Sequence, residues 1–381
     1  MTNSSAMLVI QDEVFEGSLH LDEVMLSAIP SATKGAGSFA FATQNGINAI
    51  FNSNEFHDYC HSGNHFELIL GIDSVTNDET LLYAKRLSDS LDGRLIVKVY
   101  YDKSSSSIFH PKTTWFENKP EFNSGSMFVG SGNLTLSGLQ SNVEMFSWIE
   151  LNQSCLNETK DTWNKWLHRA NEAHHIFDVD DPVVLERANA NTTSFVKDAK
   201  TASGGTVLEV PNEPIAAASH EVIVATIPSQ RSRGWSQFAM PREYYTDFFG
   251  FSLEDTPEAK DMRVLLRAVN ADKTLELAES RTGNISRTSQ NYRIELEGAR
   301  GIDIDDGEHP IVVIVKIGPR EYLYEIFDSK SSFVVPLRDF AKRTNYGLRS
   351  HELPKCLTTV KDLRNSFPDL PILNVKDDGD A

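Results

Sequence analysis

The sequence has few cysteines and no long apolar run, and both absences narrow the class of protein. Its 381 residues include only three cysteines, Cys60, Cys155 and Cys356, whose wide spacing fits neither a disulfide framework nor a paired zinc motif. No stretch of about eighteen or more apolar residues is present, and the amino terminus lacks a basic region followed by an apolar one. We therefore expect a cytoplasmic protein that has no membrane-spanning segment.

Basic residues are also in deficit, since 36 Lys and Arg face 54 Asp and Glu and leave a net charge of −18. Proteins that bind nucleic acid usually present a basic surface, so the total charge argues against that class. The local distribution argues for it. Residues 228–242 and 281–293 each contain three arginines and no acidic residue, whereas 294–310 contain six acidic residues. Two basic loops on an acidic body would confine a duplex to one face, and ordinary solvated arginine loops are the alternative.

The sequence does contain the groups that metal-free phosphodiester chemistry needs. Alternation along the extended run 107–116 places His110 and Lys112 on the same face of a predicted strand. A neutral imidazole attacks a phosphodiester when its tautomer is fixed, and Glu144 can orient it by accepting the other ring N–H. Lys112 and Asn133 would hold the phosphoryl oxygens, with the Ser131 hydroxyl as a further donor. Glycines around Ser131 would let backbone N–H groups approach the anion.

This ordered set resembles the signature of the phospholipase D superfamily, which is a His-x-Lys pair, a Gly-Ser-x-Asn turn and an acidic residue shortly after it. The stretch 127–144 looks most like the restriction endonucleases of the nuclease branch. Many members carry two such motifs and this chain has one, so the resemblance implies a homodimer that joins two copies of His110. One would form a covalent phosphohistidine and the partner's His110 would protonate the leaving oxygen. A chance His-Pro-Lys beside an ordinary turn is the alternative.

The pattern of apolar residues divides the chain into a first part, 1–177, a partly ordered linker, 178–218, and a second part, 219–381. In the first part we predict strands at 38–43, 65–71, 94–100, 127–129 and 143–151, and helices at 78–91 and 158–174. Strands that alternate with helices indicate an α/β sandwich, a mixed sheet covered by helices. The first part is thus expected to be the phospholipase-D-like catalytic and dimerisation domain.

The second part is predicted to be mainly β, with strands at 220–227, 262–269, 291–296, 311–317 and 321–328 and a short helix at 242–249. The segment 235–249 and the order of elements resemble the DNA-binding pseudobarrel of plant auxin-response-type transcription factors, which recurs in phospholipase-D-type restriction enzymes. That resemblance implies two arms that grip the major groove of double-stranded DNA, at 230–237 and 286–293. The predicted DNA-binding residues are Gln230, Arg231, Arg233, Trp235, Gln237, Arg281, Arg287, Ser289, Gln290, Asn291 and Arg293.

Together the resemblances imply a sequence-specific, metal-independent restriction endonuclease that cleaves double-stranded DNA and needs no cofactor. The chain has no Gly-x-x-x-x-Gly-Lys-Ser/Thr loop, so any ATP use would come from a separate helicase-like subunit, beside a cognate DNA methyltransferase. Two alternatives stay open. One is a phospholipid-cleaving phosphodiesterase with the same catalytic groups, and the other is a non-catalytic DNA-binding regulator.

One cluster has a spacing compact enough for zinc, namely His57, Cys60, His61 and His65. However, 58–63 is predicted to be a loop and His65 begins an apolar strand. We therefore predict no metal site.

Overall fold

A computed structural model describes residues 4–12, 14–15, 18–103, 108–191, 214–227, 237–254, 256, 262–286, 291–300, 302, 309–328, 330–344 and 353–375. These residues form two compact units, one that ends at Asn191 and one that begins at Pro214. The predicted linker, 178–218, therefore contributes described residues to both units.

The first unit is built on a mixed sheet of eight strands in the order β1-β7-β6-β5-β2-β3-β4-β8. The strands are β1 (Ser5–Gln11), β2 (Ala32–Phe39), β3 (His65–Gly71), β4 (Leu95–Tyr100), β5 (Lys112–Asn118), β6 (Ser124–Gly130), β7 (Glu144–Asn152) and β8 (Ile176–Asp178). β2, β3 and β4 are parallel, and the other neighbours pair antiparallel. The predicted mixed α/β architecture is confirmed.

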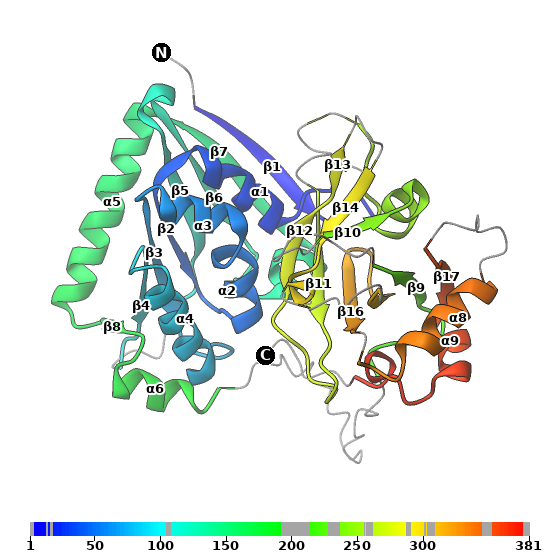
Figure 1. Cartoon of the computed structure of the whole chain (residues 1–381). Coiled ribbons are helices and arrows are strands. Elements are labelled where there is room, and N and C mark those ends of the chain that lie inside the picture. The colour runs from blue at the N-terminus through cyan, green and yellow to red at the C-terminus, as the bar shows by residue number, and fades with distance from the viewer. Residues whose placement is uncertain are drawn as a thin grey trace, which may run out of the picture. The chain divides into compact units, whose positions relative to one another are not determined.

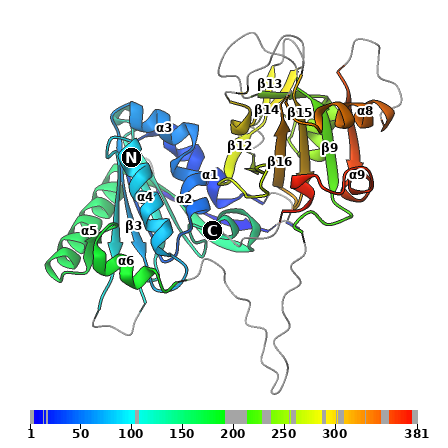
Figure 2. The same ribbon diagram turned by 60° about the horizontal axis from the view of Figure 1, so that its bottom comes forward.

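Helices cover both faces of this sheet (Figure 1, Figure 2). They are α1 (Leu21–Ala28), α2 (Gln44–Phe51), α3 (Asn54–His61), α4 (Asp78–Ser90), α5 (Gln153–Glu172) and α6 (Pro182–Ala188), with short helical turns at Ile29–Ser31, Pro120–Phe122 and Ser137–Ser141. α5 lies on one face, where Leu156 and Trp163 pack against Trp115 of the sheet. α1 to α4 lie on the opposite face, where Phe51 contacts Phe66 of β3. Apolar side chains thus fill two layers, one on each side of the strands.

Helix α3 replaces the loop that the sequence predicts at 58–63. Ser53 caps it by accepting a hydrogen bond from the backbone N–H of Phe56 at 3.2 Å. Phe56, Tyr59 and Cys60 are buried and follow a helical spacing. The polar residues between them hide that spacing in the sequence. The helix ends at His61, and Gly63 follows with a φ of 86°.

The second unit contains a six-stranded sheet, ordered β12-β11-β16-β15-β9-β17, and a three-stranded sheet, ordered β10-β14-β13. The strands are β9 (Glu221–Thr226), β10 (Gln237–Met240), β11 (Arg263–Ala268), β12 (Glu279–Thr282), β13 (Asn284–Ser286), β14 (Asn291–Glu295), β15 (Ile311–Lys316), β16 (Glu321–Phe327) and β17 (Lys355–Thr359). The helices are α8 (Val334–Thr344) and α9 (Val360–Ser366), with short helical turns at Tyr244–Phe248, Glu297–Ala299 and Pro371–Leu373.

Two cores lie on the two faces of the six-stranded sheet. Along β15, Val313 and Val315 point into the core that includes Leu337 of α8, whereas Val312 and Ile314 point into the core shared with the three-stranded sheet. The predicted mainly β character is therefore confirmed. Among the described strands no closed barrel is found, because β12 and β17 end the larger sheet. Within the described residues, no helix is long and apolar enough to cross a membrane.

Candidate active site

The structure brings the predicted pair His110 and Lys112 together at one end of the sheet. β5 begins at Lys112, later than the sequence predicts, because Pro111 has no N–H to give to a strand ladder. Instead, the carbonyl oxygen of Pro111 accepts a hydrogen bond from Ala40 N at 2.8 Å. The His110 side chain is exposed, and Lys112 Nζ lies 3.2 Å from both its Nδ1 and its Nε2.

An ammonium group donates only, so Lys112 can give a hydrogen bond to a ring nitrogen of His110 that carries a lone pair. Burial lowers the pKa of Lys112, and the Glu144 carboxylate opposes that shift. Lys112 therefore places a hydrogen-bond donor directly beside the His110 ring.

Phe41 completes this side of the site, and the sequence gives it no role beyond a predicted strand. Its ring meets the His110 ring edge-on, with centroids 5.8 Å apart at 75°, and Lys112 Nζ lies 6.0 Å from its centroid. The backbone of Phe41 accepts a hydrogen bond from Leu134 N at 3.0 Å, next to Asn133. Phe41 thus joins the segment that carries His110 to the segment that carries Asn133.

A hydrogen bond joins the side chains of Ser131 and Glu144. The Ser131 hydroxyl donates to Oε2 of the buried Glu144, and Asn142 Nδ2 donates to Oε1 at 3.1 Å. The backbone N–H of Met145 donates to the Ser131 hydroxyl oxygen at 3.1 Å. Within the described chain no hydrogen bond joins Glu144 to His110. The orienting contact and the free Ser131 donor expected from the sequence are thus not found within one chain.

Gly130 and Gly132 allow close packing of the backbone, whereas the sequence suggested that they let backbone N–H groups approach an anion. Neither Gly130 nor Gly132 is in the left-handed region that would demand glycine. A Cβ on Gly130 would lie 2.3 Å from Cβ of Phe146, and one on Gly132 would lie 2.8 Å from the Gly138 carbonyl oxygen. These glycines allow close packing of the backbone beneath the site. The same turn buries Oδ1 of Asn133, for which the described residues provide no hydrogen-bond partner.

Most of the predicted DNA-binding residues lie outside the described part of the chain. These are Gln230, Arg231, Arg233, Trp235, Arg287, Ser289 and Gln290, and Asn291 is described only by its backbone in β14. Gln237 and Arg293 are brought together on β10 and β14, where Arg293 Nη1 donates to Gln237 Oε1 at 3.0 Å. Their roles in DNA binding stay predictions.

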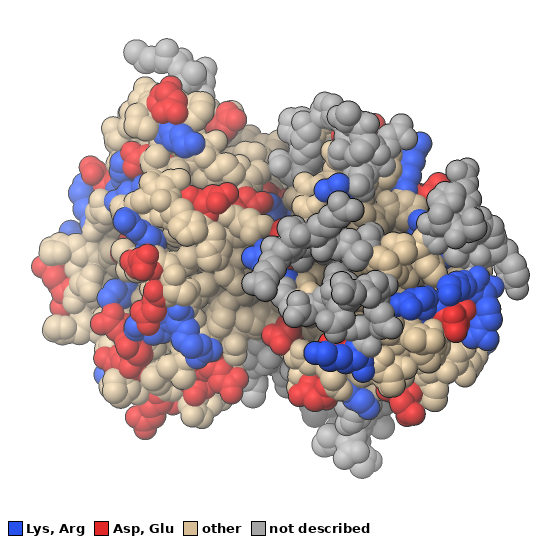
Figure 3. Space-filling model, viewed as in Figure 1, with Lys and Arg blue, Asp and Glu red and all other residues tan. Residues whose placement is uncertain are grey.

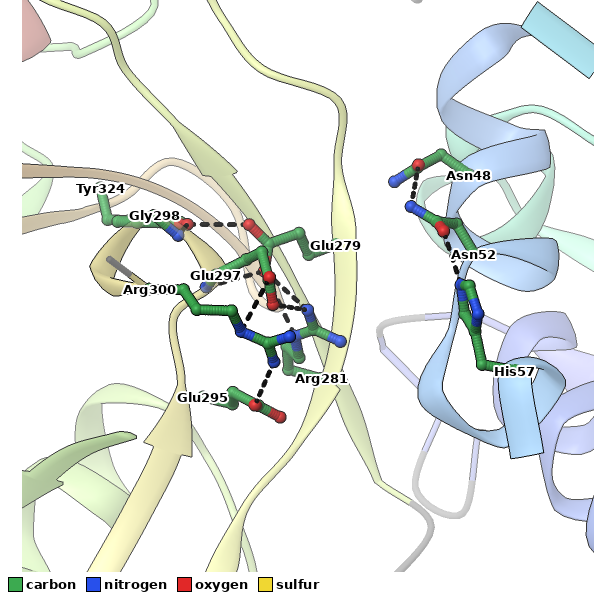
Figure 4. A network of polar contacts seen from close by, with 10 residues as sticks. All are labelled: Asn48, Asn52, His57, Glu279, Arg281, Glu295, Glu297, Gly298, Arg300 and Tyr324. Atoms are coloured by element: carbon green, nitrogen blue, oxygen red, sulfur yellow. Dashed lines mark hydrogen bonds and ion pairs between the residues drawn. The ribbon is translucent and has the colours of Figure 1, made fainter. Parts of the chain in front are cut away.

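Arg281 lies in a polar network inside the second unit, which Figure 4 shows. Its side chain is 11% exposed, and its Nη2 is 3.1 Å from Glu279 Oε2 and 3.4 Å from Glu297 Oε2. The Tyr324 hydroxyl donates to the other oxygen of Glu279 at 2.8 Å. Burial raises the pKa of Glu279, and Arg281 opposes this by favouring the carboxylate. The guanidinium group of Arg281 thus forms ion pairs within the second unit. The sequence alone did not distinguish this role from a contact with DNA.

A basic surface that the sequence analysis missed lies on α8. This helix carries Arg338, Lys342 and Arg343 against a single acidic residue, Asp339. Lys342 and Arg343 are exposed, and Figure 3 shows basic side chains gathered over this helix. The surface offers positive charge to a polyanion independently of the two predicted arms.

The histidine and cysteine cluster does not form a metal site among the described residues, where no group of three or more potential ligands converges. His57 Nε2 lies 2.8 Å from Asn52 Oδ1 (Figure 4), and burial lowers the pKa of His57. Burial also raises the pKa of the Cys60 thiol to about 11, which disfavours the thiolate that binds zinc.

Comparisons with known proteins give weak likenesses only. No family model and no curated protein matches the sequence. NucT from Helicobacter pylori shares 16% identity with 44% of this chain, over 97% of its own length, at a TM-score of 0.32. Nuc from Salmonella typhimurium, a phospholipase D family member, shares 15% over 46% of this chain and 98% of its own, at 0.32. Phosphatidylserine synthase from Haemophilus influenzae Rd KW20 shares 13% over 46% of this chain and 39% of its own, at 0.33. The functional assignment therefore depends on the residues of the site.

Proposed function

We propose that the first unit is a metal-independent phosphodiesterase whose nucleophile is His110. The observation that carries this proposal is the position of Lys112 Nζ, 3.2 Å from both ring nitrogens of an exposed imidazole. A ring nitrogen attacks phosphorus, and the bond from phosphorus to the leaving sugar oxygen breaks with its electron pair on that oxygen. The partner's His110 supplies a proton to that oxygen, and water then hydrolyses the phosphohistidine. Lys112 and Asn133 stabilise the charge on the phosphoryl oxygens.

The proposed substrate is double-stranded DNA, cleaved at specific sequences by a restriction endonuclease. The mainly β second unit would read the sequence as a pseudobarrel, through the arms at 230–237 and 286–293. The basic face of α8 supports DNA as the substrate because Lys342 and Arg343 are exposed and can neutralise phosphates. A helicase-like ATPase subunit and a cognate methyltransferase are the proposed partners for any ATP-dependent activity.

A homodimer is proposed because an apolar strip of the sheet beside the site is exposed. Leu8 is 65% exposed, Val129 42% and Met145 52%. Leu8 and Val129 flank Ser147 on neighbouring strands, so these side chains share one face. A second copy would cover this strip and bring its His110 to the shared site. Replacing Val129 with Asp should give monomers and abolish cleavage, and Phe122→Asp, at an exposed apolar position in the turn between β5 and β6, is the matched control. Cleavage by a monomeric Val129→Asp protein would contradict the shared site.

The direct experiment is cleavage of plasmid DNA in excess chelator by the wild type and by His110→Ala. We expect the wild type to cut without added metal and His110→Ala to bind specific DNA without cutting it. Glu172→Ala, a change of an exposed carboxylate on α5, controls for general effects of substitution. Cutting by a pure His110→Ala preparation, or cutting that requires magnesium, would refute the mechanism.

One observation favours a second candidate function, the cleavage of phospholipids. A largely apolar cavity of about 560 Å³ lies between the sheet and α5, and its lining includes Phe109 and Pro111 on either side of His110, with Trp163 and Trp166 beneath. Such a volume accommodates an apolar group next to a scissile phosphate. Short-chain phosphatidylcholine and plasmid DNA should therefore be compared as substrates at equal enzyme concentration. Turnover of the lipid alone would favour this second function.

A further inference from the structure

We infer that Phe109 is the anchor that sets the position of His110, and that Asp73 is the positioning residue that holds this anchor. This inference rests on the proposed role of His110 as nucleophile. His110 precedes β5 and is exposed, so neither a strand ladder nor a tightly packed core fixes it. Besides the ring contact with Phe41, its backbone is restrained through its neighbours in the chain, and Phe109 is held by both its backbone and its ring.

The first restraint on Phe109 acts on its backbone. Its N–H donates to Asp73 Oδ2 at 2.9 Å. A carboxylate that accepts a backbone N–H makes a short, charge-assisted bond. Asp73 lies just beyond β3, 36 positions earlier in the sequence, so this bond ties the loop before β5 to the end of a central strand.

The second restraint acts on the Phe109 ring. It stacks on Tyr100 at a centroid distance of 4.5 Å and an angle of 14°, and lies 6.2 Å from Trp166 at 11°. The Tyr100 hydroxyl is itself fixed by a hydrogen bond to His175 Nδ1 at 3.1 Å. Gly71 makes room for this arrangement, because a Cβ there would lie 3.0 Å from Cδ1 of Phe109. Ring and backbone of Phe109 are therefore held by separate elements.

The loop that carries Asp73 is braced in turn by α6 and the residues after it. Arg187 Nη2 donates to the carbonyl oxygen of Asp73 at 3.0 Å, and Asn191 Nδ2 donates to those of Ile72 and Thr76, each at 2.8 Å. The hydroxyl of Thr76 accepts from Ala42 N at 2.9 Å, next to Phe41. The same loop thus positions both the chain before His110 and the segment whose ring contacts His110.

The nature of the Asp73 contact predicts which substitutions preserve it. The carboxylate acts as an acceptor for one N–H, and the amide oxygen of Asn can accept the same bond. Asp73→Asn should therefore keep His110 in place, whereas Asp73→Ala should release Phe109 N. Arg187→Ala should displace His110 less than Asp73→Ala does, since it removes only one hydrogen bond to the backbone of Asp73.

The first test measures kcat and KM for bis(p-nitrophenyl) phosphate, with Asp89→Ala as matched control because Asp89 is an exposed carboxylate paired with Lys85. We expect kcat of Asp73→Ala to fall about tenfold or more with KM nearly unchanged, since small misplacement of a reacting group is costly. Asp73→Asn should recover most of kcat, and thermal unfolding should show that each variant folds. Equal loss in the Ala and Asn variants, or a change in KM alone, would overturn the inference.

A second test is independent of turnover, so it separates this inference from the proposed function. Diethyl pyrocarbonate modifies exposed imidazoles, and peptide mass spectrometry gives its rate at His110 relative to His168, whose side chain is 74% exposed. Asp73→Ala should raise this ratio as the ring leaves Lys112 and Phe41, and Asp73→Asn should keep it near the wild-type value. An unchanged ratio in Asp73→Ala would overturn the inference even if the wild type cleaves nothing. A wild type without turnover but with the expected ratios would refute the proposed function alone.

Discussion

The carboxyl group of Glu325 makes the stability of the second unit depend on pH. Glu325 lies on β16, is 5% exposed, and accepts a hydrogen bond from Ile372 N at 2.9 Å. Burial raises its pKa from the ordinary 4.5 to about 8, against the smaller opposing effect of that hydrogen bond. At neutral pH Glu325 is therefore protonated in the folded state and ionised in the unfolded state.

The sign and size of the effect follow from this difference. Between pH 4.5 and about 8 the folded state holds one proton more than the unfolded state, so the free energy of unfolding falls by about 1.4 kcal/mol per pH unit. This stabilising contribution is fully present below the pKa of Glu325 in the unfolded state. It is lost as the pH rises through the pKa of Glu325 in the folded state. From pH 5 to pH 7 the loss is about 2 to 3 kcal/mol. Glu325→Gln keeps an acceptor oxygen and cannot ionise, so it should remove this slope.

Hydrogen exchange of the whole protein measures this directly in peptides that cover β15 and β16. Comparing Glu325→Gln with the wild type at each pH cancels the intrinsic pH dependence of exchange. The variant should gain protection relative to the wild type from pH 5 to pH 8, and Asp369→Asn, at an exposed carboxyl, should not. A difference between Glu325→Gln and the wild type that stays constant across this range would refute the reasoning.

Three further predictions concern packing and charge. Arg281→Met leaves the buried carboxylate of Glu279 without its guanidinium partner and should destabilise the second unit by about 3 kcal/mol, measured by hydrogen exchange of β12; unchanged exchange would contradict the network. Gly130→Ala places a Cβ 2.3 Å from that of Phe146, so we expect a lower thermal unfolding temperature together with reduced cleavage. The double substitution Lys342→Ala and Arg343→Ala should weaken DNA binding about equally for all sequences and reduce the slope of log K against log salt by about 2. An unaltered slope would remove α8 from the DNA interface.

Much of the fold could be predicted because local patterns determine it. The strand predicted at 65–71 matches β3, His65–Gly71, and the helix predicted at 78–91 matches α4, Asp78–Ser90, to within one residue. Both segments have strong apolar periodicity and clear ends, such as the Asn77 cap on α4, whose Oδ1 accepts from Thr80 N at 2.8 Å. The proximity of His110 and Lys112 also followed from the sequence, since they are two positions apart, although β5 begins only at Lys112.

Contacts between distant parts of the chain could not be predicted in this way. Phe41 and Asp73 reach the site only because β2 and β3 end near the point where β5 begins, and nothing in their local sequence marks them. Glu144 forms a hydrogen bond with Ser131, which the sequence did not foresee for a related reason. Its proximity to the site followed from the sequence, but the choice between His110 and Ser131 depends on side-chain directions at the start of β7 that spacing does not encode.

The placement of His110 outside the strand follows from what a nucleophile for a large substrate needs. A residue within β5 would be flanked by β2 and β6, and its ring would be shielded by its neighbours on the sheet. Because Pro111 has no N–H, the hydrogen-bonded ladder of β5 does not extend back to His110. The ring is therefore exposed, but His110 lacks the hydrogen bonds that keep a strand residue in register. The contacts of Asp73 with Phe109 N and of Ala40 N with the Pro111 carbonyl stand on either side of His110 and replace those lost bonds. Accessibility and precise position are thus supplied by different parts of the chain, so a change at Asp73 should loosen the position of His110 without shielding its ring.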